Sequence, residues 1–270
     1  MNIGYLGPKG TFTYFAVESA YNNQSDYSLI EKSSLDQLFD SLLDKKLDAI
    51  FCPFENSIEG PVNRVLDRLT HSDMAIHDMV TMPINQSILA KEAISYSNIS
   101  HIISMPHAIA QCYSFIRTNC PNATIHHSSS TAGALTMINS LNLPDDQTII
   151  IGHKGISKFH PILVLESNVQ DQKENFTHFC LIKPKLDSNF DTHKDTHVIL
   201  SFSTPHDAPG SLLNVLSIFK DYNINLTKIL SRPEKSNLGH YIFYIEFALD
   251  LDSINLQAVL ESMSQYTLFQ

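Results

Sequence analysis

The chain has 270 residues, of which 43% are hydrophobic, so it is long enough for one large or two modest domains, each with its own core. Its formal net charge of −10, without a lysine and arginine cluster, argues against nucleic acid and anionic membrane surfaces as partners, because both need a basic face. The amino-terminal Met1–Leu6 has no basic segment, and no stretch approaches a membrane-spanning length. We therefore expect a cytoplasmic protein with no membrane partner.

The cysteines and histidines give no pattern of a metal site. The four cysteines are scattered among apolar neighbours without a Cys-x-x-Cys pair, which predicts reduced, mostly buried thiols rather than disulfides or zinc ligands. The thirteen histidines lack zinc-ligand spacing. His126 and His127 are adjacent, and adjacent residues on a strand face opposite ways. We predict no metal.

The chain begins with a strand over Ile3–Leu6, followed by the turn Gly7–Thr13 and a helix from near Tyr14. The two glycines of this turn let backbone approach a ligand, and Thr11 is its candidate binding residue. The turn lacks the ending and spacing of a Walker loop, so a purely structural turn is an equal alternative. Ser34 is expected to cap the next helix.

The next motif follows a short buried strand over Asp48–Cys52 and reads Pro53–Gly60. It places a carboxylate, an amide and a hydroxyl, those of Glu55, Asn56 and Ser57, just before the free N–H groups of a helix start. Open α/β sheets bind ligands at this position, and the donors suit an anion. The alternative is an ordinary helix cap with a glycine in a tight turn.

The same strand, turn and helix rhythm restarts further along the chain. Strands are predicted near 88–89, 102–104, 124–126 and 149–152, with Pro106 opening one helix and Ser128–Ala134 leading into another. The alternation predicts a parallel sheet flanked by helices. Three strand ends present Ser, Thr, Asn or Gln, which is more than capping requires, so we expect them to converge on one cleft.

These motifs, taken in order, resemble those of the prephenate dehydratases. The matching segments are Gly7–Phe12, Pro53–Gly60, Ala110–Cys112, Ser130–Ala132, Asn168–Asp171 and Asn175–Phe179. The remainder resembles the family's regulatory ACT domain in Pro209–Leu213 and Asn223–Pro233. Six motifs in register with an appended domain span nearly the whole chain, which makes chance similarity a poor explanation.

The resemblance implies a monofunctional enzyme that converts prephenate to phenylpyruvate, water and carbon dioxide without a cofactor. It also implies an α/β fold with a two-lobed, periplasmic-binding-protein-like catalytic domain over 1–182 and a C-terminal ferredoxin-like (α+β) ACT domain over 196–270. The expected lobes are about 1–77 plus 165–182 and about 78–164, with a linker at 183–195. Two chain crossings form a hinge that allows closure over the substrate.

Site residues are carried over from the family by motif position. Thr177 is the expected hydrogen-bond donor to the departing hydroxyl, and Phe179 is expected to wall the ring. The other expected substrate-binding residues are Thr11, Glu55, Asn56, Ser57, Ser104, Gln111, Ser130, Thr131 and His178. A threonine hydroxyl is a weak acid, so it would help by positioned hydrogen bonding. Taken without the resemblance, Thr177 is an ordinary β-branched strand residue.

The ACT segment implies phenylalanine as an allosteric effector and side-by-side pairing into a homodimer or homotetramer. The expected effector-binding residues are Pro209, Gly210, Leu212, Asn225, Leu226, Thr227 and Ser231. The predicted order of elements in this segment is βαββα, which is one strand short of the ferredoxin-like pattern. The sequence stops at Gln270, short of the family's usual ending, so the last ACT strand is expected to be clipped.

Two departures from the family pattern affect function. His178 stands where the family has arginine, which replaces a permanent cation with a group whose charge depends on pH. Leu230 stands where the family's regulatory motif has glutamate, which predicts weaker phenylalanine binding. Two alternatives therefore stay open: a divergent relative with altered or lost catalysis, and a non-enzymatic amino-acid sensor.

Overall fold

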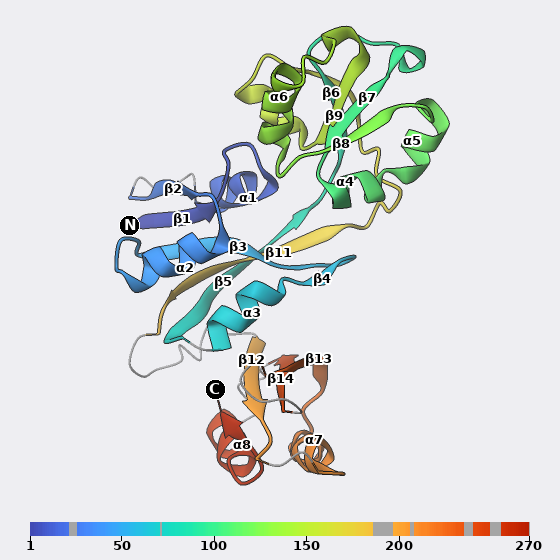
Figure 1. Cartoon of the computed structure of the whole chain (residues 1–270). Coiled ribbons are helices and arrows are strands. Elements are labelled where there is room, and N and C mark those ends of the chain that lie inside the picture. The colour runs from blue at the N-terminus through green and yellow to red at the C-terminus, as the bar shows by residue number, and fades with distance from the viewer. Residues whose placement is uncertain are drawn as a thin grey trace. The chain divides into compact units, whose positions relative to one another are not determined.

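A computed structural model of the chain describes residues 1–21, 26–70, 72–185, 197–205, 208–234, 240–248 and 255–269. The chain divides into two compact units, Met1–Lys185 and Leu186–Gln270 (Figure 1). Most of the expected linker, from residue 186 to 195, lies outside the described residues.

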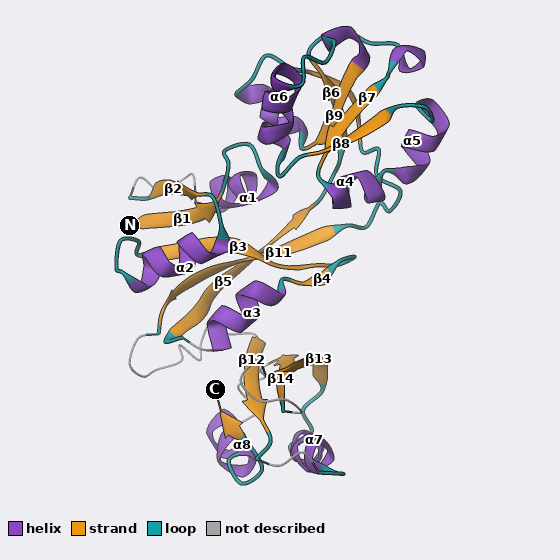
Figure 2. Ribbon diagram, in the orientation of Figure 1, coloured by secondary structure: helices purple, strands orange, loops and turns teal. Residues whose placement is uncertain are grey.

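The first lobe of the N-terminal unit is built on a six-stranded sheet in the order β2-β1-β3-β11-β5, with β4 beside β3. β1 is parallel to β2 and β3, whereas β11 is antiparallel to β3 and β5 (Figure 2). The elements are β1 (Asn2–Leu6), α1 (Phe12–Tyr21), β2 (Ser28–Lys32), α2 (Leu35–Leu43), β3 (Ala49–Asn56), β4 (Gly60–Pro61), α3 (Asn63–Thr70), β5 (Met74–Pro83) and β11 (Phe176–Pro184).

Helices cover both faces of this sheet because successive side chains of β1 point to opposite sides. Ile3 and Tyr5 belong to a core cluster that includes Phe15 of α1. Gly4 points to the other face, where a Cβ would lie 2.9 Å from a methyl carbon of Leu38 in α2. The absence of a side chain at this position therefore lets α2 pack directly on the strand.

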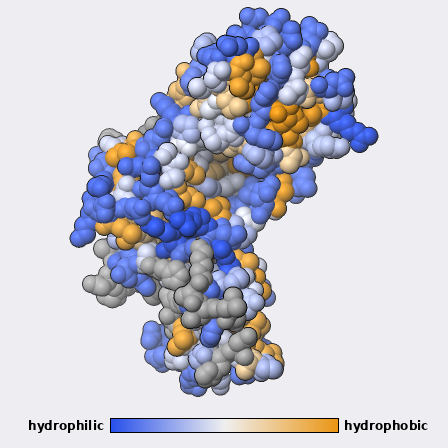
Figure 3. Space-filling model, in the orientation of Figure 1, coloured by the Kyte–Doolittle hydropathy of each residue, from blue (hydrophilic) through white to orange (hydrophobic). Residues whose placement is uncertain are grey.

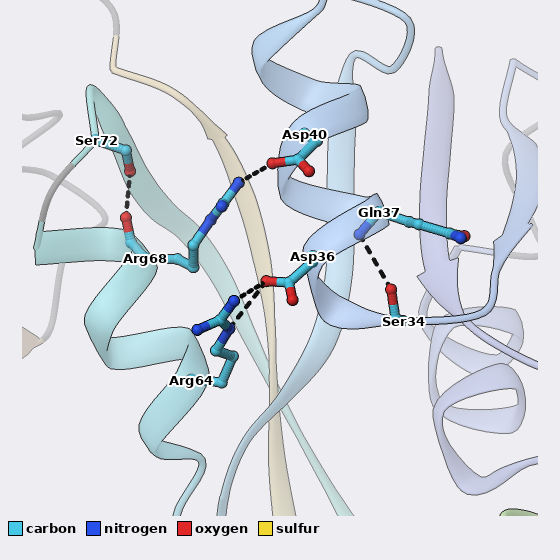
Figure 4. A network of polar contacts seen from close by, with 7 residues as sticks. All are labelled: Ser34, Asp36, Gln37, Asp40, Arg64, Arg68 and Ser72. Atoms are coloured by element: carbon cyan, nitrogen blue, oxygen red, sulfur yellow. Dashed lines mark hydrogen bonds and ion pairs between the residues drawn. The ribbon is translucent and has the colours of Figure 1, made fainter.

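Two ion pairs connect α3 to the neighbouring α2 (Figure 4). The Nε and Nη2 atoms of Arg64 donate to Oδ1 of Asp36 at 2.9 and 2.6 Å, and Arg68 donates to Asp40 one turn further along. Ser34 caps α2 as predicted, because its Oγ accepts from the N–H of Gln37 at 3.2 Å. The two ion pairs between α2 and α3 are largely exposed to solvent, so each contributes at most about 1 kcal/mol to folding stability.

The second lobe is built on a five-stranded sheet in the order β10-β6-β9-β7-β8. β7 is parallel to β8 and β9, whereas β6 is antiparallel to β9 and β10. Its elements are β6 (Ser87–Ala90), η1 (Tyr96–Asn98), β7 (His101–Ser104), α4 (Pro106–Gln111), α5 (Tyr113–Asn119), β8 (Thr124–His127), α6 (Thr131–Ser140), η2 (Asp145–Gln147), β9 (Thr148–Gly152), η3 (Lys154–Lys158) and β10 (Leu163–Ser167).

Both sheets are mixed rather than parallel, which corrects the sequence-based prediction. The antiparallel strands are those next to the two crossings between the lobes, at 84–86 and 168–175, because a strand that returns from the other lobe enters the sheet in the opposite direction. The expected lobe limits near 77 and 165 fall inside β5 and β10. The crossings are hydrogen-bonded to each other, with Val169 N donating to Gln86 O at 3.1 Å.

The C-terminal unit has a four-stranded sheet in the order β13-β14-β12-β15. Its elements are β12 (His197–Ser203), α7 (Ser211–Asp221), β13 (Leu226–Pro233), β14 (Tyr241–Ala248), α8 (Leu256–Met263) and β15 (Leu268–Phe269). The last strand, expected to be missing, is present as β15 beside β12. Two residues are too few for a readable alternation, so the pattern could not predict it. Phe202, Phe247 and Phe219 lie in the core of this unit.

Hydrophilic residues predominate on the face of the molecule in Figure 3, with scattered apolar patches. No helix within the described ranges is long and apolar enough to cross a membrane. All four cysteines are buried and free, as the sequence predicted, and Cys52 and Cys180 lie opposite each other on β3 and β11 with their sulfur atoms 4.0 Å apart.

Candidate active site

The end of β3 meets the beginning of β11, and this junction brings Asn56 opposite Thr177. The side-chain amide of Asn56 donates to Oγ1 of Thr177 at 2.9 Å. The carbonyl oxygen of the same side chain accepts from the N–H groups of Ile58 and Glu59, both at 3.0 Å, which fixes the orientation of the amide. Because Thr177 Oγ1 accepts this bond, its own hydrogen stays available for donation to another group.

Asn175 is a residue of this junction that sequence reasoning missed. Its Oδ1 accepts from the Asn56 amide at 2.7 Å, its side chain is buried, and its Nδ2 has no hydrogen-bond partner among the residues that the structure describes. Asn175 thus helps hold the Asn56 amide that contacts Thr177. Its position two residues before Thr177 in a recognised motif was the available signal, because a buried asparagine needs partners from elsewhere in the fold.

Ser57 extends the same junction. Its N–H donates to Phe176 O at 2.9 Å, and its Oγ accepts from Phe176 N at 3.0 Å. The serine hydroxyl therefore closes the end of the sheet and keeps one hydrogen to donate. Glu55 lies opposite His178 on the neighbouring strand. Gly60 has a φ of 82°, a left-handed conformation that allows the chain to turn back into β4.

Thr177 and His178 point to opposite faces of β11, because side chains alternate along a strand. Nδ1 of His178 lies 2.8 Å from Oγ1 of Thr81 on β5, whereas Thr177 is on the face that packs against α1. The two side chains therefore do not approach one substrate group from the same side. This geometry weakens the expectation that His178 replaces the family's arginine as a carboxylate partner.

Phe179 lies in the core rather than on the surface of a site. Its side chain is only 1% exposed and stacks on Phe51, with ring centroids 5.7 Å apart. A ring so enclosed has no free face for a substrate ring. The expectation that Phe179 walls the substrate is therefore replaced by a supporting role beneath Thr177, on the same face of β11.

The expected residues of the second lobe gather at the ends of β7, β8 and β9. Ser104 donates from its Oγ to Ile151 O at 2.7 Å, and Ser130 caps α6 by accepting from Gly133 N at 2.9 Å. Thr131 packs against Gly152, where a Cβ would lie 2.5 Å from its hydroxyl oxygen. The structure thus brings these three residues together. The Ser104 hydroxyl uses its hydrogen on a backbone carbonyl, whereas the Ser130 hydroxyl accepts and keeps its hydrogen for donation.

Thr11 and Gln111 occupy the ends of two other elements. Thr11 precedes α1, and its Oγ1 accepts from Tyr14 N at 3.3 Å, so it caps the helix, a role compatible with the purely structural turn that was the alternative. Gln111 ends α4, and its Oε1 accepts from the side chain of Gln86 at 3.2 Å. Sequence reasoning missed Gln86, which is fully buried.

Two histidines outside the sequence-based set have perturbed protonation. Burial lowers the pKa of His107 in α4, and the Glu59 carboxylate opposes that shift, which places a residue of the second lobe in the field of the first. Burial, followed by the charges of Lys154 and Lys158, lowers the pKa of His153 to about 4. His153 stacks on Phe15 of α1 with ring centroids 4.3 Å apart, so it too sits where the lobes touch.

The C-terminal unit contains a hollow of about 200 Å³ lined by residues around the start of α7 and the start of β14. Gly210 and Leu212 from the expected effector set line it, and Pro209 lies in the same turn. Asn225, Leu226, Thr227 and Ser231 lie on β13 or just before it and do not line it. The lining residues that the motifs missed include Thr204, His240 and Tyr241.

Within the described residues, no group of three or more His, Cys, Asp or Glu side chains could hold a metal ion. The polar groups of the junction are amides and hydroxyls, which suit hydrogen bonding to an oxygen-rich organic anion.

Comparisons with known proteins agree with these motifs. A sequence model described as prephenate dehydratase matches residues 3–186, and one described as ACT domain matches residues 198–266. A prephenate dehydratase of Bacillus subtilis is 28% identical over 97% of this chain and 94% of its own. A prephenate dehydratase of Arthrobacter aurescens, solved in complex with L-Phe, is 26% identical with a TM-score of 0.85 over 99% of this chain and 87% of its own.

One structural neighbour has a different activity. The quorum-quenching acylase GqqA superimposes with a TM-score of 0.83 over 99% of this chain and 94% of its own, at 17% identity. That similarity shows a shared fold alone. Activity must therefore be argued from the site residues and not from the architecture.

Proposed function

The chain belongs to the prephenate dehydratase family, and on this premise we propose that Thr177 and Asn56 form the catalytic junction for the decarboxylative dehydration of prephenate. The enzyme is a carbon–oxygen lyase of phenylalanine biosynthesis. Residues 1–182 form its catalytic part, and residues 196–270 form its regulatory part. The enzyme works in the cytoplasm. The observation that carries the proposal is the 2.9 Å hydrogen bond from the Asn56 amide to Thr177 Oγ1.

This bond assigns a direction to the threonine hydroxyl. Because Asn56 occupies an acceptor site of Oγ1, the hydrogen of Thr177 points elsewhere and can donate to the departing hydroxyl of prephenate. As the ring carboxylate leaves as carbon dioxide, the electron pair of the broken carbon–carbon bond enters the ring. That electron pair displaces the ring hydroxyl, so the carbon–oxygen bond breaks. The hydroxyl takes up one proton from solvent and leaves as water. The product gains an aromatic ring.

The remaining residues hold the substrate around this centre. Ser57 and Gln111 supply donors to substrate oxygens, and Glu55 and Thr11 shape the turns beside them. Ser130 and Thr131 form the start of α6, whose N–H groups favour an anion such as the pyruvyl carboxylate, and Ser104 bonds to the neighbouring strand β9. The ring carboxylate is best placed where it is poorly solvated, because neutral carbon dioxide then leaves more readily.

The decisive experiment measures phenylpyruvate formation from prephenate by wild-type protein and by Thr177→Val, which keeps volume but removes the hydroxyl. We expect kcat to fall by on the order of 10²- to 10³-fold with little change in KM, because a transition-state interaction is lost. Thr81→Val is the matched control, since Thr81 lies on β5 on the face opposite Thr177. Near-normal kcat in Thr177→Val would remove Thr177 from the mechanism.

The regulatory part of the proposal concerns phenylalanine. An amino acid with an apolar ring suits the hollow in the C-terminal unit, where Leu212, Leu213 and Phe243 offer apolar surface beside the Gly210 turn. Binding there would favour a less active state and lower prephenate turnover. The expected assembly is a homodimer or a dimer of dimers with isologous interfaces. Sedimentation with and without phenylalanine distinguishes the two assemblies.

A further inference from the structure

Gln86 lies in the first crossing between the lobes and is 0% exposed. Its backbone is tied to the second crossing: its N–H donates to Oε1 of Gln170 at 3.0 Å, and its carbonyl accepts from Val169 N at 3.1 Å. Gln170 donates in turn to Oδ1 of Asn85 at 2.8 Å. Both polar groups of the Gln86 backbone are thus bonded to the second crossing, which fixes the position from which its side chain extends.

That side chain reaches Gln111. Nε2 of Gln86 donates to Oε1 of Gln111 at 3.2 Å, while Oε1 of Gln86 is buried and has no hydrogen-bond partner in the described parts of the chain. A buried carbonyl oxygen without a partner is unfavourable, so a leucine or methionine would pack here at lower cost. The feature that a hydrocarbon side chain would lack is the donor to Gln111.

The donor decides which end of the Gln111 amide is free. A carboxamide has an oxygen that accepts and an NH₂ group that donates. Gln86 engages the oxygen, and within the part of the chain that the structure describes the Nε2 of Gln111 has no hydrogen-bond partner. The backbone of Gln111 is also held, because its carbonyl accepts from Asp171 N at 2.7 Å. Gln111 is therefore fixed with its donor end free.

We propose that Gln86 is a positioning residue that orients the Gln111 amide so that its NH₂ group faces the substrate. The inference rests on the proposed function, in which Gln111 supplies a donor to a substrate oxygen. Both carboxylates of prephenate only accept hydrogen bonds, so the opposite orientation of Gln111 would present an oxygen to an oxygen. Gln86, which touches no substrate atom, thus determines which end of the Gln111 amide meets the substrate.

A double-mutant cycle tests this coupling. Gln86→Met keeps the length of the side chain and removes its donor, so Gln111 loses its fixed orientation. We expect the KM for prephenate to rise about threefold to tenfold with kcat changed less than about twofold, since freeing one side chain lowers binding by that amount. In a Gln111→Met background the same substitution should cause no further rise. Gln37→Met, at an exposed position, is the control.

Each outcome decides the matter. An equal rise in KM in both backgrounds would mean that Gln86 acts independently of Gln111, and an unchanged KM in Gln86→Met would mean that it does not act on binding. Failure of both Gln86→Met and Gln86→Leu to fold would make Gln86 a purely structural residue. All three results overturn the inference. If wild-type protein forms no phenylpyruvate, the proposed function itself fails, which separates that failure from a cycle without coupling.

Discussion

Acidification should loosen the contact between α1 and η3, because His153 is held there as a neutral imidazole. Its ring stacks on Phe15 at 4.3 Å and meets the edge of Phe12 at 4.8 Å between centroids. Nδ1 accepts from Gly155 N at 3.0 Å, so a proton on this nitrogen would break that bond. Burial, with the nearby charges of Lys154 and Lys158, lowers the pKa of His153 from 6.5 to about 4.

The direction of the pH effect on stability depends on how many protons His153 binds in the folded and unfolded chain. Between about pH 6.5 and about pH 4 the unfolded chain binds a proton at His153 and the folded chain does not, so stability is fully present above about pH 6.5 and falls as the pH falls toward 4. The gap between the two pKa values corresponds to about 3 kcal/mol in total. Between about pH 7.5 and about pH 5 the loss is about 2 kcal/mol.

Urea unfolding followed by far-UV circular dichroism measures this loss, since the chain has no tryptophan for fluorescence. His153→Phe should lose about 2 kcal/mol less between the two pH values than wild-type protein does. His160→Gln, an exposed histidine of the same segment, should behave like wild type. His107 and His126, whose pKa values burial also lowers, remain in all three proteins. An equal pH-dependent loss in His153→Phe and wild type would refute the reasoning.

Two further predictions concern the departures from the family motifs. His178→Arg should leave the KM for prephenate within about twofold of the wild-type value, because His178 bonds to Thr81 on the face opposite Thr177. A wild-type KM that rises with pH, and a KM of the variant that does not, would instead support His178 as the carboxylate partner that replaces the family's arginine. Leu230→Glu should leave phenylalanine binding within about twofold in calorimetry, because Leu230 lies on β13 and does not line the hollow. A tightening of about fivefold or more would place the effector beside β13, as the family motif implies, where a carboxylate can pair with its ammonium group, and no binding to either protein at millimolar phenylalanine would make the C-terminal unit a dimerisation module.

The sequence determined the family, the two-part organisation and the chemical types of the site residues. The motifs contain Asn56 and Thr177 as an amide and a hydroxyl at strand ends, and these residue types already indicate hydrogen bonding rather than metal chemistry. Local signals also held where the physics is local: Ser34 caps its helix and Pro106 opens another, because a cap depends only on the next few residues.

Strand direction and side-chain direction were decided by the tertiary structure. Asn56 and Thr177 are separated by 121 positions, and only the antiparallel pairing of β3 with β11 places them in contact. The motif presents Thr177, His178 and Phe179 as one group, whereas the sheet sends His178 to the opposite face and Phe179 into the core. A motif records residue order, but the pleat of a strand and the elements packed on it determine which of those residues share a side.

The same reason explains the residues that the sequence did not reveal. Gln86, Asn175 and His153 each act through partners from distant segments, namely α4, the end of β3 and α1. A buried amide or imidazole looks the same in a sequence whether its partners are present or not. Its role becomes defined only when folding removes water from around it and leaves a few protein groups within hydrogen-bonding distance.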